Sequence, residues 1–411
     1  MFIIYRYIFA PIIWILFKFG AFFFESFSKR NAVINEFKTA NLQFNPQKKV
    51  LWVHAASMGE FEQAKPIIEY LRSIDFNTYS IIVTFFSPSG YEHQKNYPFA
   101  DICTYLPIDK YVSMEQFVQT ISPSVVVFIR YEIWPNLLTI LSKFSIPYYF
   151  ANATFPNSKF WKLFGSSLLK SVLSSAEGIF CVNEKEFKKF KHLLGATNVH
   201  LSNDTRIDRI VEKVKYNQPF DFYQLPNKPV IVLGSSWEAE TSILAEISST
   251  VLKQFHIIIV PHKPVTTTIS QLQKQFPHSV LLSNLYKDSN LNSEIVIVDS
   301  IGKLLSIYSI ATIAFVGGGF GRCVHSTVEP LAYGIPVVCG PNISKSPDAT
   351  TFAEIGLVTI VQTAQDVENI LNKVLNDSKW LEAIRIKSVA TIEPSLGESK
   401  RIGEIIRRHL V

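Results

Sequence analysis

The chain has 411 residues, of which 47% are hydrophobic, 13% aromatic and 18% charged, and its formal net charge is +6. This length predicts two or three domains with enough buried surface to fold without disulfides. The composition excludes a disordered chain, a coiled coil or a collagen-like fibre, and the positive excess is too dispersed to indicate a nucleic-acid-binding protein.

Residues 1–28 begin with an almost entirely apolar segment. The uncharged run at 7–17 is shorter than the roughly 20 apolar residues that a membrane-spanning helix needs. If Lys18 extends its side chain to the membrane surface, the apolar stretch reaches Phe24 and is just long enough to cross the bilayer. No small-x-small cleavage site follows, and the basic pair at 29–30 favours a cytoplasmic location for the rest of the chain. We expect an uncleaved anchor or interfacial helix; the alternative is a buried helix of the first domain.

Beyond this segment, short apolar runs alternate with longer amphipathic stretches, which predicts parallel strands joined by helices. The expected strands of a first series are 49–55, 80–84, 125–129, 148–151 and 178–182. Those of a second series are 229–234, 257–260, 295–298, 313–316 and 336–339. Open parallel sheets bind ligands at the carboxyl ends of their strands. The fold class we predict is therefore α/β, with two Rossmann-like domains facing each other across a cleft.

The domain boundaries follow from the same pattern. We expect an anchor at 1–28, a first Rossmann-like domain at 29–215, a linker at 216–228, a second domain at 229–398 and a terminal helix at 399–411. The linker contains two prolines and shows no helical period. The terminal helix is basic on one face, and it either packs back across the hinge or caps the second domain. The cysteines at 103, 181, 323 and 339 form no C-x-x-C pair, so we expect reduced, packed thiols.

The first candidate site is HAASMGE at 54–60, between the first expected strand and a helix that starts near Phe61. Small residues such as Gly59 allow a substrate to approach the backbone closely. Glu60 is expected at a helix N-terminus, where the helix dipole keeps a carboxylate ionised. Such a carboxylate is suited to accept a proton from an attacking hydroxyl group. The alternative is a helix-capping glutamate beside a hydrogen-bonded His54.

The second candidate site is IRYEIWPNL at 129–137, directly after another buried strand. It brings Arg130, Glu132 and Trp134 to the point where that strand ends. Two charged residues at such a position indicate a function in binding or catalysis. An Arg–Glu ion pair within the loop is the alternative.

In the second half, VGGGFGRCVHSTVEP at 316–330 is a strand followed by glycines and a helix start, which predicts backbone N–H groups directed at a phosphate. It does not match the dinucleotide pattern G-x-G-x-x-G, because Arg322 or Val324 occupies the last position. Glu329 follows His325 by one helical turn and is placed to accept hydrogen bonds from ribose hydroxyls. The alternative is an acid on a helix surface.

A further strand ends in VPHKP at 260–264. We expect His262 and Lys263 to add positive charge that neutralises a phosphate group. Taken alone, such a pair is also typical of a solvated loop.

Together these motifs resemble the Kdo (3-deoxy-D-manno-octulosonic acid) transferases, which are inverting glycosyltransferases of the GT-B fold acting on lipid A precursors. The match runs in order along almost the whole chain. It comprises HAASMGE, YEIWPN, NATF at 152–155, DTRIDR at 204–209, GSSWEAE at 234–240, VPHKP, and GGGFG…HSTVEP…GIPVVCGP at 317–341.

The resemblance implies transfer of Kdo from CMP-Kdo to the lipid A precursor lipid IVA in lipopolysaccharide inner-core biosynthesis, with inversion at the anomeric carbon. Glu60 corresponds to the S-x-G-E glutamate that serves as general base in the family. The implied acceptor contacts are Ser57, Gly59, Arg130 and Glu132. The implied donor contacts are Ser235, Ser236, His262, Lys263, Gly317, Gly318, Gly319, Phe320, Gly321, Ser326 and Glu329.

The resemblance also implies an enzyme on the cytoplasmic face of the inner membrane, bound to the membrane surface. We expect no metal and no cofactor, and the sequence contains no D-x-D motif. Arg130 stands where many family members carry an acid, and Ser326 stands where asparagine is usual. The stretch at 346–348 replaces an aromatic-x-Glu sequence. Two alternatives remain: a GT-B transferase with a UDP-sugar donor, and an inactive membrane-bound binding protein of the same fold.

Overall fold

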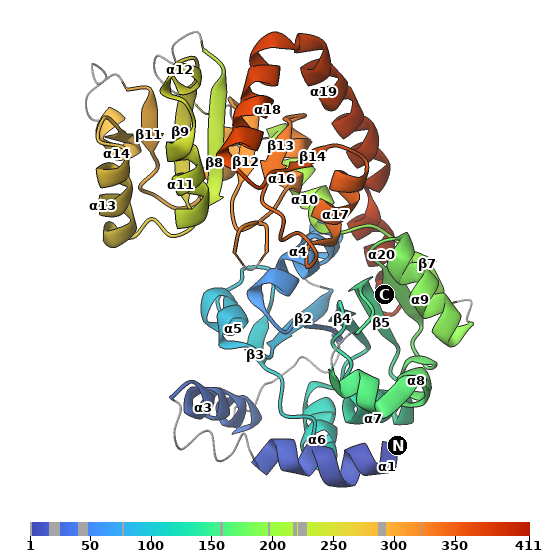
Figure 1. Ribbon diagram of the computed structural model, residues 1–411. Coiled ribbons are helices and arrows are strands. Elements are labelled where there is room, and N and C mark those ends of the chain that lie inside the picture. The colour runs from blue at the N-terminus through green and yellow to red at the C-terminus, as the bar shows by residue number, and fades with distance from the viewer. Residues whose placement is uncertain are drawn as a thin grey trace. The chain divides into compact units, whose positions relative to one another are not determined.

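The structure is a computed structural model. It describes residues 2–15, 25–39, 48–75, 78–156, 159–195, 198–216, 220, 228–286, 293–321 and 323–411. The chain divides into two compact units, one formed by residues 1–208 with 395–411 and the other by 209–394 (Figure 1). The chain therefore leaves the first unit earlier than the expected linker, and most of that linker lies outside the described residues.

The first unit is built on a seven-stranded parallel sheet with the order β3-β2-β1-β4-β5-β6-β7. Its strands are β1 (Lys49–His54), β2 (Tyr79–Phe85), β3 (Ile102–Tyr105), β4 (Val125–Ile129), β5 (Tyr148–Ala153), β6 (Gly178–Cys181) and β7 (Val199–Leu201). Its helices are α3 (Glu25–Thr39), α4 (Met58–Ile74), α5 (Pro88–Gln94), α6 (Tyr111–Ile121), α7 (Pro135–Lys143), α8 (Lys159–Leu173), α9 (Glu184–Leu194), the start of α10 (Arg206–Tyr216), and α20 (Glu398–Arg407). The central strands are buried along their whole length, which is why they appear in the sequence as continuous apolar runs.

The second unit contains a second seven-stranded parallel sheet, with the order β10-β11-β9-β8-β12-β13-β14. Its strands are β8 (Val230–Ser236), β9 (His256–Pro261), β10 (Val280–Leu281), β11 (Ile295–Ile297), β12 (Ile313–Val316), β13 (Val337–Cys339) and β14 (Val358–Ile360). Its helices are α11 (Glu238–Glu246), α12 (Ser249–Leu252), α13 (Thr266–Gln275), α14 (Leu282–Leu285), α15 (Leu304–Tyr308), α16 (Val328–Ala332), α17 (Pro347–Glu354), α18 (Ala364–Asn376) and α19 (Ser378–Ile392). All ten expected strands are confirmed, and the structure adds β3, β7, β10 and β14.

The two sheets share one topological feature that determines where ligands bind. In the first sheet the strand order reverses between β1 and β4, and in the second it reverses between β8 and β12. The loops that follow these strands diverge, so a crevice opens at the carboxyl ends of the strands. The candidate motifs HAASMGE and YEIWPN follow β1 and β4, and GSSWEAE and the glycine run follow β8 and β12.

The described part of the expected anchor is helical and packs on the first unit. It comprises α1 (Phe2–Ile4), the π-helix η1 (Tyr5–Phe9) and helical residues 10–15. Tyr5 and Ala10 are buried in the core of this unit, whereas the large apolar residues at positions 3, 4, 7, 8, 12 and 15 are exposed. Residues 16–24 of the expected anchor lie outside the described residues. Among the residues that the structure describes, no helix is long and apolar enough to cross a membrane.

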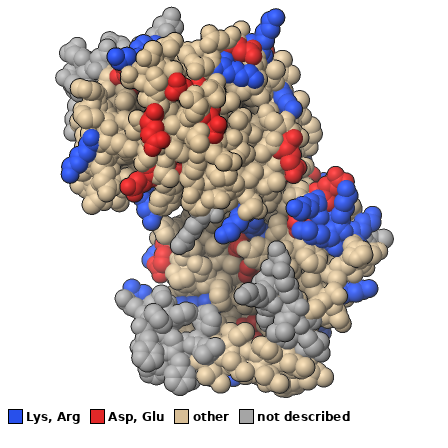
Figure 2. Space-filling view, in the orientation of Figure 1, with Lys and Arg blue, Asp and Glu red and all other residues tan. Residues whose placement is uncertain are grey.

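The C-terminal helix α20 belongs to the first unit. Ile402, Ile406 and Leu410 lie in the core of that unit. Asp208, the last residue before the chain crosses to the second unit, accepts hydrogen bonds from the backbone N–H groups of Gly397 and Ser399 at 2.6 and 2.7 Å. The tail therefore does not cap the second domain. Figure 2 shows that much of the visible face carries no charged side chain, in keeping with the low charged fraction of the chain.

Candidate functional site

Glu60 lies at the start of α4, directly beyond the carboxyl end of β1. The preceding Ser57 is the N-cap residue and has an extended backbone, and its N–H donates a hydrogen bond to Oε2 of Glu60 at 3.1 Å. A glutamate at the third position of a helix commonly forms this contact. The side chain is nearly buried, with the residue 5% exposed.

Burial raises the pKa of Glu60 to about 7, and the neighbouring Glu132 carboxylate adds to the increase. Arg130 and the backbone N–H groups of Ala56 and Ser57 oppose it. The helix N-terminus therefore does not keep Glu60 fully ionised at neutral pH, because desolvation and a like charge outweigh Arg130 and the N–H groups that favour the carboxylate. A carboxylate whose pKa lies near neutral pH is well matched to general-base catalysis.

Glu132 is held by a chain of buried hydrogen bonds that begins at Trp52. The Trp52 indole donates to Oγ1 of Thr84 at 2.8 Å, and that hydroxyl lies 2.8 Å from Nδ1 of His54. Nε2 of His54 lies 3.3 Å from Oε2 of Glu132, which also accepts from Nε1 of Trp134 at 3.1 Å. Nδ1 of His54 also lies 3.0 Å from the carbonyl oxygen of Thr84, which holds the ring against β2. Glu132 is thus positioned by His54 and Trp134, not by an ion pair with Arg130.

Arg130 follows β4 with a left-handed backbone, at φ 63°. Its N–H donates to the carbonyl of Ala151 at 3.0 Å, which continues the sheet for one more residue. Its side-chain Nε is buried and has no hydrogen-bond partner among the described residues. A non-glycine residue in this backbone region is strained, and such strain is concentrated at functional sites. The charge of Arg130 acts on Glu60, whose pKa it lowers.

The loop that carries Glu132 continues into α7, which begins without a capping side chain of its own. Asp109, from the segment after β3, supplies the cap and accepts hydrogen bonds from the N–H groups of Asn136 and Leu137, both at 3.0 Å. Tyr5 of the N-terminal segment donates to the same carboxylate at 2.7 Å. Burial raises the pKa of Asp109 to about 6. Asp109 was not predicted as a site residue; its only signal in the sequence is a helix start, WPN, without a capping residue.

In the second unit, three rings form a stack at the ends of β8, β9 and β12. Trp237 and His262 have ring centroids 4.6 Å apart, and His262 and His325 are 4.4 Å apart. Nε1 of Trp237 donates to Nε2 of His325 at 3.0 Å. Burial, with a further contribution from His262, lowers the pKa of His325 to about 4. Trp237 and His325 were part of the quoted motifs but were not predicted as contacts.

The expectation that His262 contributes positive charge is corrected. Burial lowers the pKa of His262, and the neighbouring Lys263 lowers it further. The imidazole is therefore neutral at physiological pH, and Lys263 is the residue of this pair that carries the charge.

The N–H groups of the glycine run are largely hydrogen-bonded within the unit. Gly318 and Phe320 donate to Oε1 of Glu240 at 2.8 and 3.5 Å. Gly317 and Gly321 donate to backbone carbonyls. The expectation that these four N–H groups bind a phosphate is therefore wrong, because an internal carboxylate and the backbone already occupy them. Glu240 itself was not predicted as a site residue.

The glycines are required for close packing of the loops. A side chain at Gly317 would overlap the carbonyl of Ser235, and one at Gly319 would overlap the backbone of Gly340. Ser235 has a left-handed backbone, at φ 51°, at the end of β8. The glycine run, which follows β12, thus packs closely against the ends of β8 and β13.

The remaining predicted donor contacts lie next to the glycine run. Ser326 precedes α16, and Glu329 lies in the first turn of that helix; both are half-buried. His325 is not part of the helix, so the expectation that Glu329 follows it by one helical turn is wrong. Ser236 is 4% exposed, and its Oγ has no hydrogen-bond partner among the described residues.

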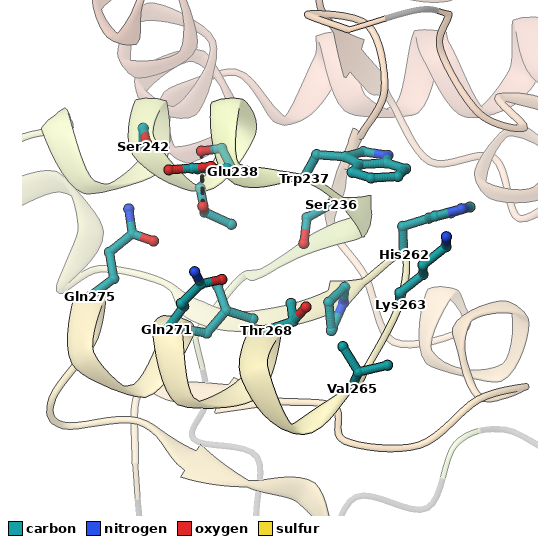
Figure 3. Close-up of a pocket in the computed structure, with 13 residues that line it drawn as sticks. Ser236, Trp237, Glu238, Ser242, His262, Lys263, Val265, Thr268, Gln271 and Gln275 are labelled. Carbon is teal, nitrogen blue, oxygen red and sulfur yellow. Dashed lines mark hydrogen bonds between the residues drawn. The ribbon is translucent and has the colours of Figure 1, made fainter.

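Two cavities flank the Trp237 ring. One, of about 390 Å³, lies between α11 and α13 and is lined by Ser236, Glu238, Lys263 and Gln271, among other residues (Figure 3). The other, of about 560 Å³, is lined by Trp237, Glu240, Phe320, Cys323 and His325 with their neighbours. Among the described residues, no group of three or more His, Cys, Asp and Glu side chains is arranged to hold a metal ion.

Residues 25–209 match the family model for 3-deoxy-D-manno-octulosonic-acid transferase (kdotransferase). The chain is 24% identical to the 3-deoxy-D-manno-octulosonic acid transferase of Haemophilus influenzae over 385 residues, which cover 89% of this chain and 88% of that protein. It is 28% identical to the Aquifex aeolicus enzyme of the same name, over 75% of this chain and 80% of that one. The chain is thus similar in sequence to Kdo transferases over most of its length.

The fold agrees with this assignment. The structure resembles that of a putative UDP-N-acetylglucosamine 2-epimerase from Listeria monocytogenes, with a TM-score of 0.59 and 11% identity over 88% of this chain and 96% of that one. Two Rossmann-like units with parallel sheets are the GT-B architecture, and the predicted fold class is confirmed. The chain thus combines a GT-B fold with sequence similarity to Kdo transferases.

The predicted site residues form one group in each unit. In the first unit, Ser57, Gly59, Glu60, Arg130 and Glu132 all lie in the loops after β1 and β4. In the second unit, the predicted donor contacts lie in the loops after β8, β9 and β12 and at the start of α16. None of the quoted motifs includes a residue of α13, so the sequence did not predict the polar face of this helix, which lines the smaller cavity.

Proposed function

We propose that this protein moves Kdo from CMP-Kdo to a hydroxyl group of a lipid A precursor, lipid IVA, with inversion at the anomeric carbon. The observation that carries the proposal is Glu60, a nearly buried carboxyl group at the reversal point of the first sheet whose pKa is raised to about 7. A base of this kind is what an acceptor hydroxyl needs in order to react at neutral pH.

The acceptor hydroxyl oxygen forms a bond to the anomeric carbon of Kdo while the bond from that carbon to the CMP phosphate oxygen breaks. Glu60 takes the hydroxyl proton, and CMP leaves with the electron pair of the broken bond. Arg130 and Glu132 hold the acceptor around Glu60. Because His262 is neutral, Lys263 is the side chain of the VPHKP loop that balances the charge of the departing phosphate.

Donor recognition is assigned to the loops after β8, β9 and β12. The residues proposed to contact the donor include Ser235, Ser236, Lys263, Ser326 and Glu329. The orphaned Oγ of Ser236 supports this assignment, since a buried hydroxyl without a partner gains a hydrogen bond when a polar ligand enters. The glycine run shapes the site by allowing the loops to pack closely, and most of its N–H groups are not available to the phosphate.

We place the enzyme on the cytoplasmic face of the inner membrane, bound through its N-terminal segment. Exposed apolar side chains at Ile3, Tyr7 and Ile8 suit contact with lipid. Arg6 and Lys110 lie beside them, each over an aromatic ring, at 3.4 and 4.1 Å from the ring centroid. Such cations are suited to lipid phosphates. Co-sedimentation with phosphatidylglycerol vesicles tests this, and Ile8→Glu is expected to weaken binding.

The activity is tested by incubating the full-length protein with CMP-Kdo and lipid IVA and measuring the masses of the lipid products by mass spectrometry. A mass increase of one or more Kdo units is expected. Product formed only with a UDP-sugar would identify the other GT-B reaction, and no product with either donor would identify an inactive binding protein. The outcome also gives the number of Kdo units added.

A further inference from the structure

The cavity between α11 and α13 has polar walls on both sides (Figure 3). From α13, Thr268, Gln271 and Gln275 face the cavity, and from α11, Glu238 and Ser242 line it. Its volume of about 390 Å³ lies within the range usual for small-ligand sites, roughly 300–1,000 Å³.

Helix α13 has two faces with different tasks. Ile269 and Leu272 are buried in the hydrophobic core of the second unit, which attaches the helix to the sheet. Positions 268, 271 and 275 are spaced three and four residues apart, so they form a single stripe along the helix. Gln273, on the same helix, is exposed and does not line the cavity. The polar stripe is therefore directed at the cavity by the helical spacing.

A buried hydroxyl group points to a ligand in this cavity. Ser236 lines it, is 4% exposed, and has no hydrogen-bond partner for Oγ among the described residues. Leaving such a group unsatisfied has a cost that a polar ligand removes. Lys263, also on the cavity wall, provides a positive charge.

The second cavity differs in chemistry. Trp237, Phe320 and His325 line it, so it offers aromatic faces. Such faces suit a flat nucleotide base, which stacks on them. The cavity between α11 and α13 shares Trp237 and includes His262, but it also offers amides, hydroxyls, a carboxylate and one cation. This set matches a polyhydroxylated acid, whose many hydroxyl groups both donate and accept.

We propose that the cavity between α11 and α13 is the subsite for the sugar acid of the donor, with Gln271 and Gln275 bonding its hydroxyl groups and Lys263 balancing the charge of its carboxylate as well as that of the phosphate. This inference rests on the proposed function, and it adds a location for the transferred sugar. The nucleotide is held on the other side of Trp237. The subsite therefore explains why a helix face without any motif residue is polar.

The test compares the full-length variants Gln271→Leu and Gln275→Leu with Gln273→Leu, a matched control on the same helix. The affinities of each for CMP-Kdo and for CMP are measured by titration calorimetry, alongside KM for CMP-Kdo. Each cavity variant is expected to weaken CMP-Kdo binding by about three- to tenfold, as the loss of one hydrogen bond predicts, with CMP binding unchanged. The control is expected to match the wild type in both.

An equal loss of CMP-Kdo and CMP affinity would place the nucleotide in this cavity and overturn the inference. Cavity variants indistinguishable from Gln273→Leu would overturn it as well. If the cavity variants lose CMP-Kdo affinity as expected but the wild-type protein transfers no Kdo, the proposed function is contradicted and the subsite is supported. A wild type that does not bind CMP-Kdo would contradict both.

Discussion

Two glutamates occupy equivalent places in the two units, and their environments differ. Glu60 is the third residue of α4, the helix after β1, and Glu240 is the third residue of α11, the helix after β8. Each accepts a hydrogen bond from the N–H of its N-cap residue, Ser57 or Trp237, at 3.1 Å. The local geometry of the two side chains is therefore the same.

The difference arises from the loop on the neighbouring strand. After β12, Gly318 and Phe320 donate their N–H groups to Glu240, which is fully buried. After β4, the corresponding loop brings Arg130 and Glu132, whose charges act on Glu60 in opposite directions. With the same capping geometry, Glu240 thus holds the loop after β12 in place, whereas Glu60 is a candidate base. A sequence motif at a strand end thus identifies a candidate site. The loop on the neighbouring strand decides whether the glutamate there can act as a base.

The largest effect is expected for Glu60→Gln. Removing the base should lower the rate of Kdo transfer by about 10²- to 10⁴-fold, since general-base catalysis contributes on that order. The affinity for CMP and the melting temperature should stay near those of the wild type. Glu62→Gln, on the same helix, is the control and should retain full activity. Turnover near the wild-type rate in Glu60→Gln would remove Glu60 from the role of base.

Glu240→Gln should act through the structure of the donor site. An amide can accept at only one of its two terminal atoms, so one buried N–H group loses its partner, at a cost of about 1–3 kcal/mol. The melting temperature should fall and KM for CMP-Kdo should rise, whereas kcat at saturating donor should be largely retained. Asp366→Asn, which alters a more exposed capping acid of α18, should change stability less and KM not at all. A loss of kcat without a change in KM would assign Glu240 a catalytic role.

The pH dependence of transfer tests the charges around Glu60. Because the base acts when deprotonated, kcat/KM should rise with pH through a midpoint near 7 and level off above it. Glu132→Gln removes a like charge, so the midpoint should move to lower pH. Arg130→Gln removes an opposing charge, so the midpoint should move to higher pH. Shifts in the same direction for both variants would contradict this arrangement.

The smallest effect on stability is expected for Gly59→Ala. Apart from its chain neighbours and the backbone of its own helix, no atom of the described residues lies within 4 Å of the position of an added Cβ, and Gly59 is in the first turn of α4. The melting temperature should stay the same or rise slightly, since alanine favours a helix by up to about 1 kcal/mol over glycine. A raised KM for lipid IVA alone would show that the acceptor approaches this position. A clear fall in melting temperature would contradict the open space seen here.

The sequence predicted the central part of each sheet and missed its edges. The ten expected strands are the inner ones, which are buried on both faces and therefore appear as continuous apolar runs. The four that were missed, β3, β7, β10 and β14, are the edge strands of the two sheets. They are short and only partly buried, so their sequence pattern is weak.

The sequence by itself determined the α/β class, the similarity to the Kdo transferases and the loops in which the candidate residues lie, because these depend on local patterns and ordered motifs. The tertiary structure alone decided which groups remain chemically available. Two N–H groups of the glycine run are bound by Glu240, the helix that follows Glu132 is capped by Asp109, and Glu60 has a pKa near 7. Each of these depends on partners brought together by the sheet from separate parts of the chain, and desolvation and charge proximity arise only once those parts are packed.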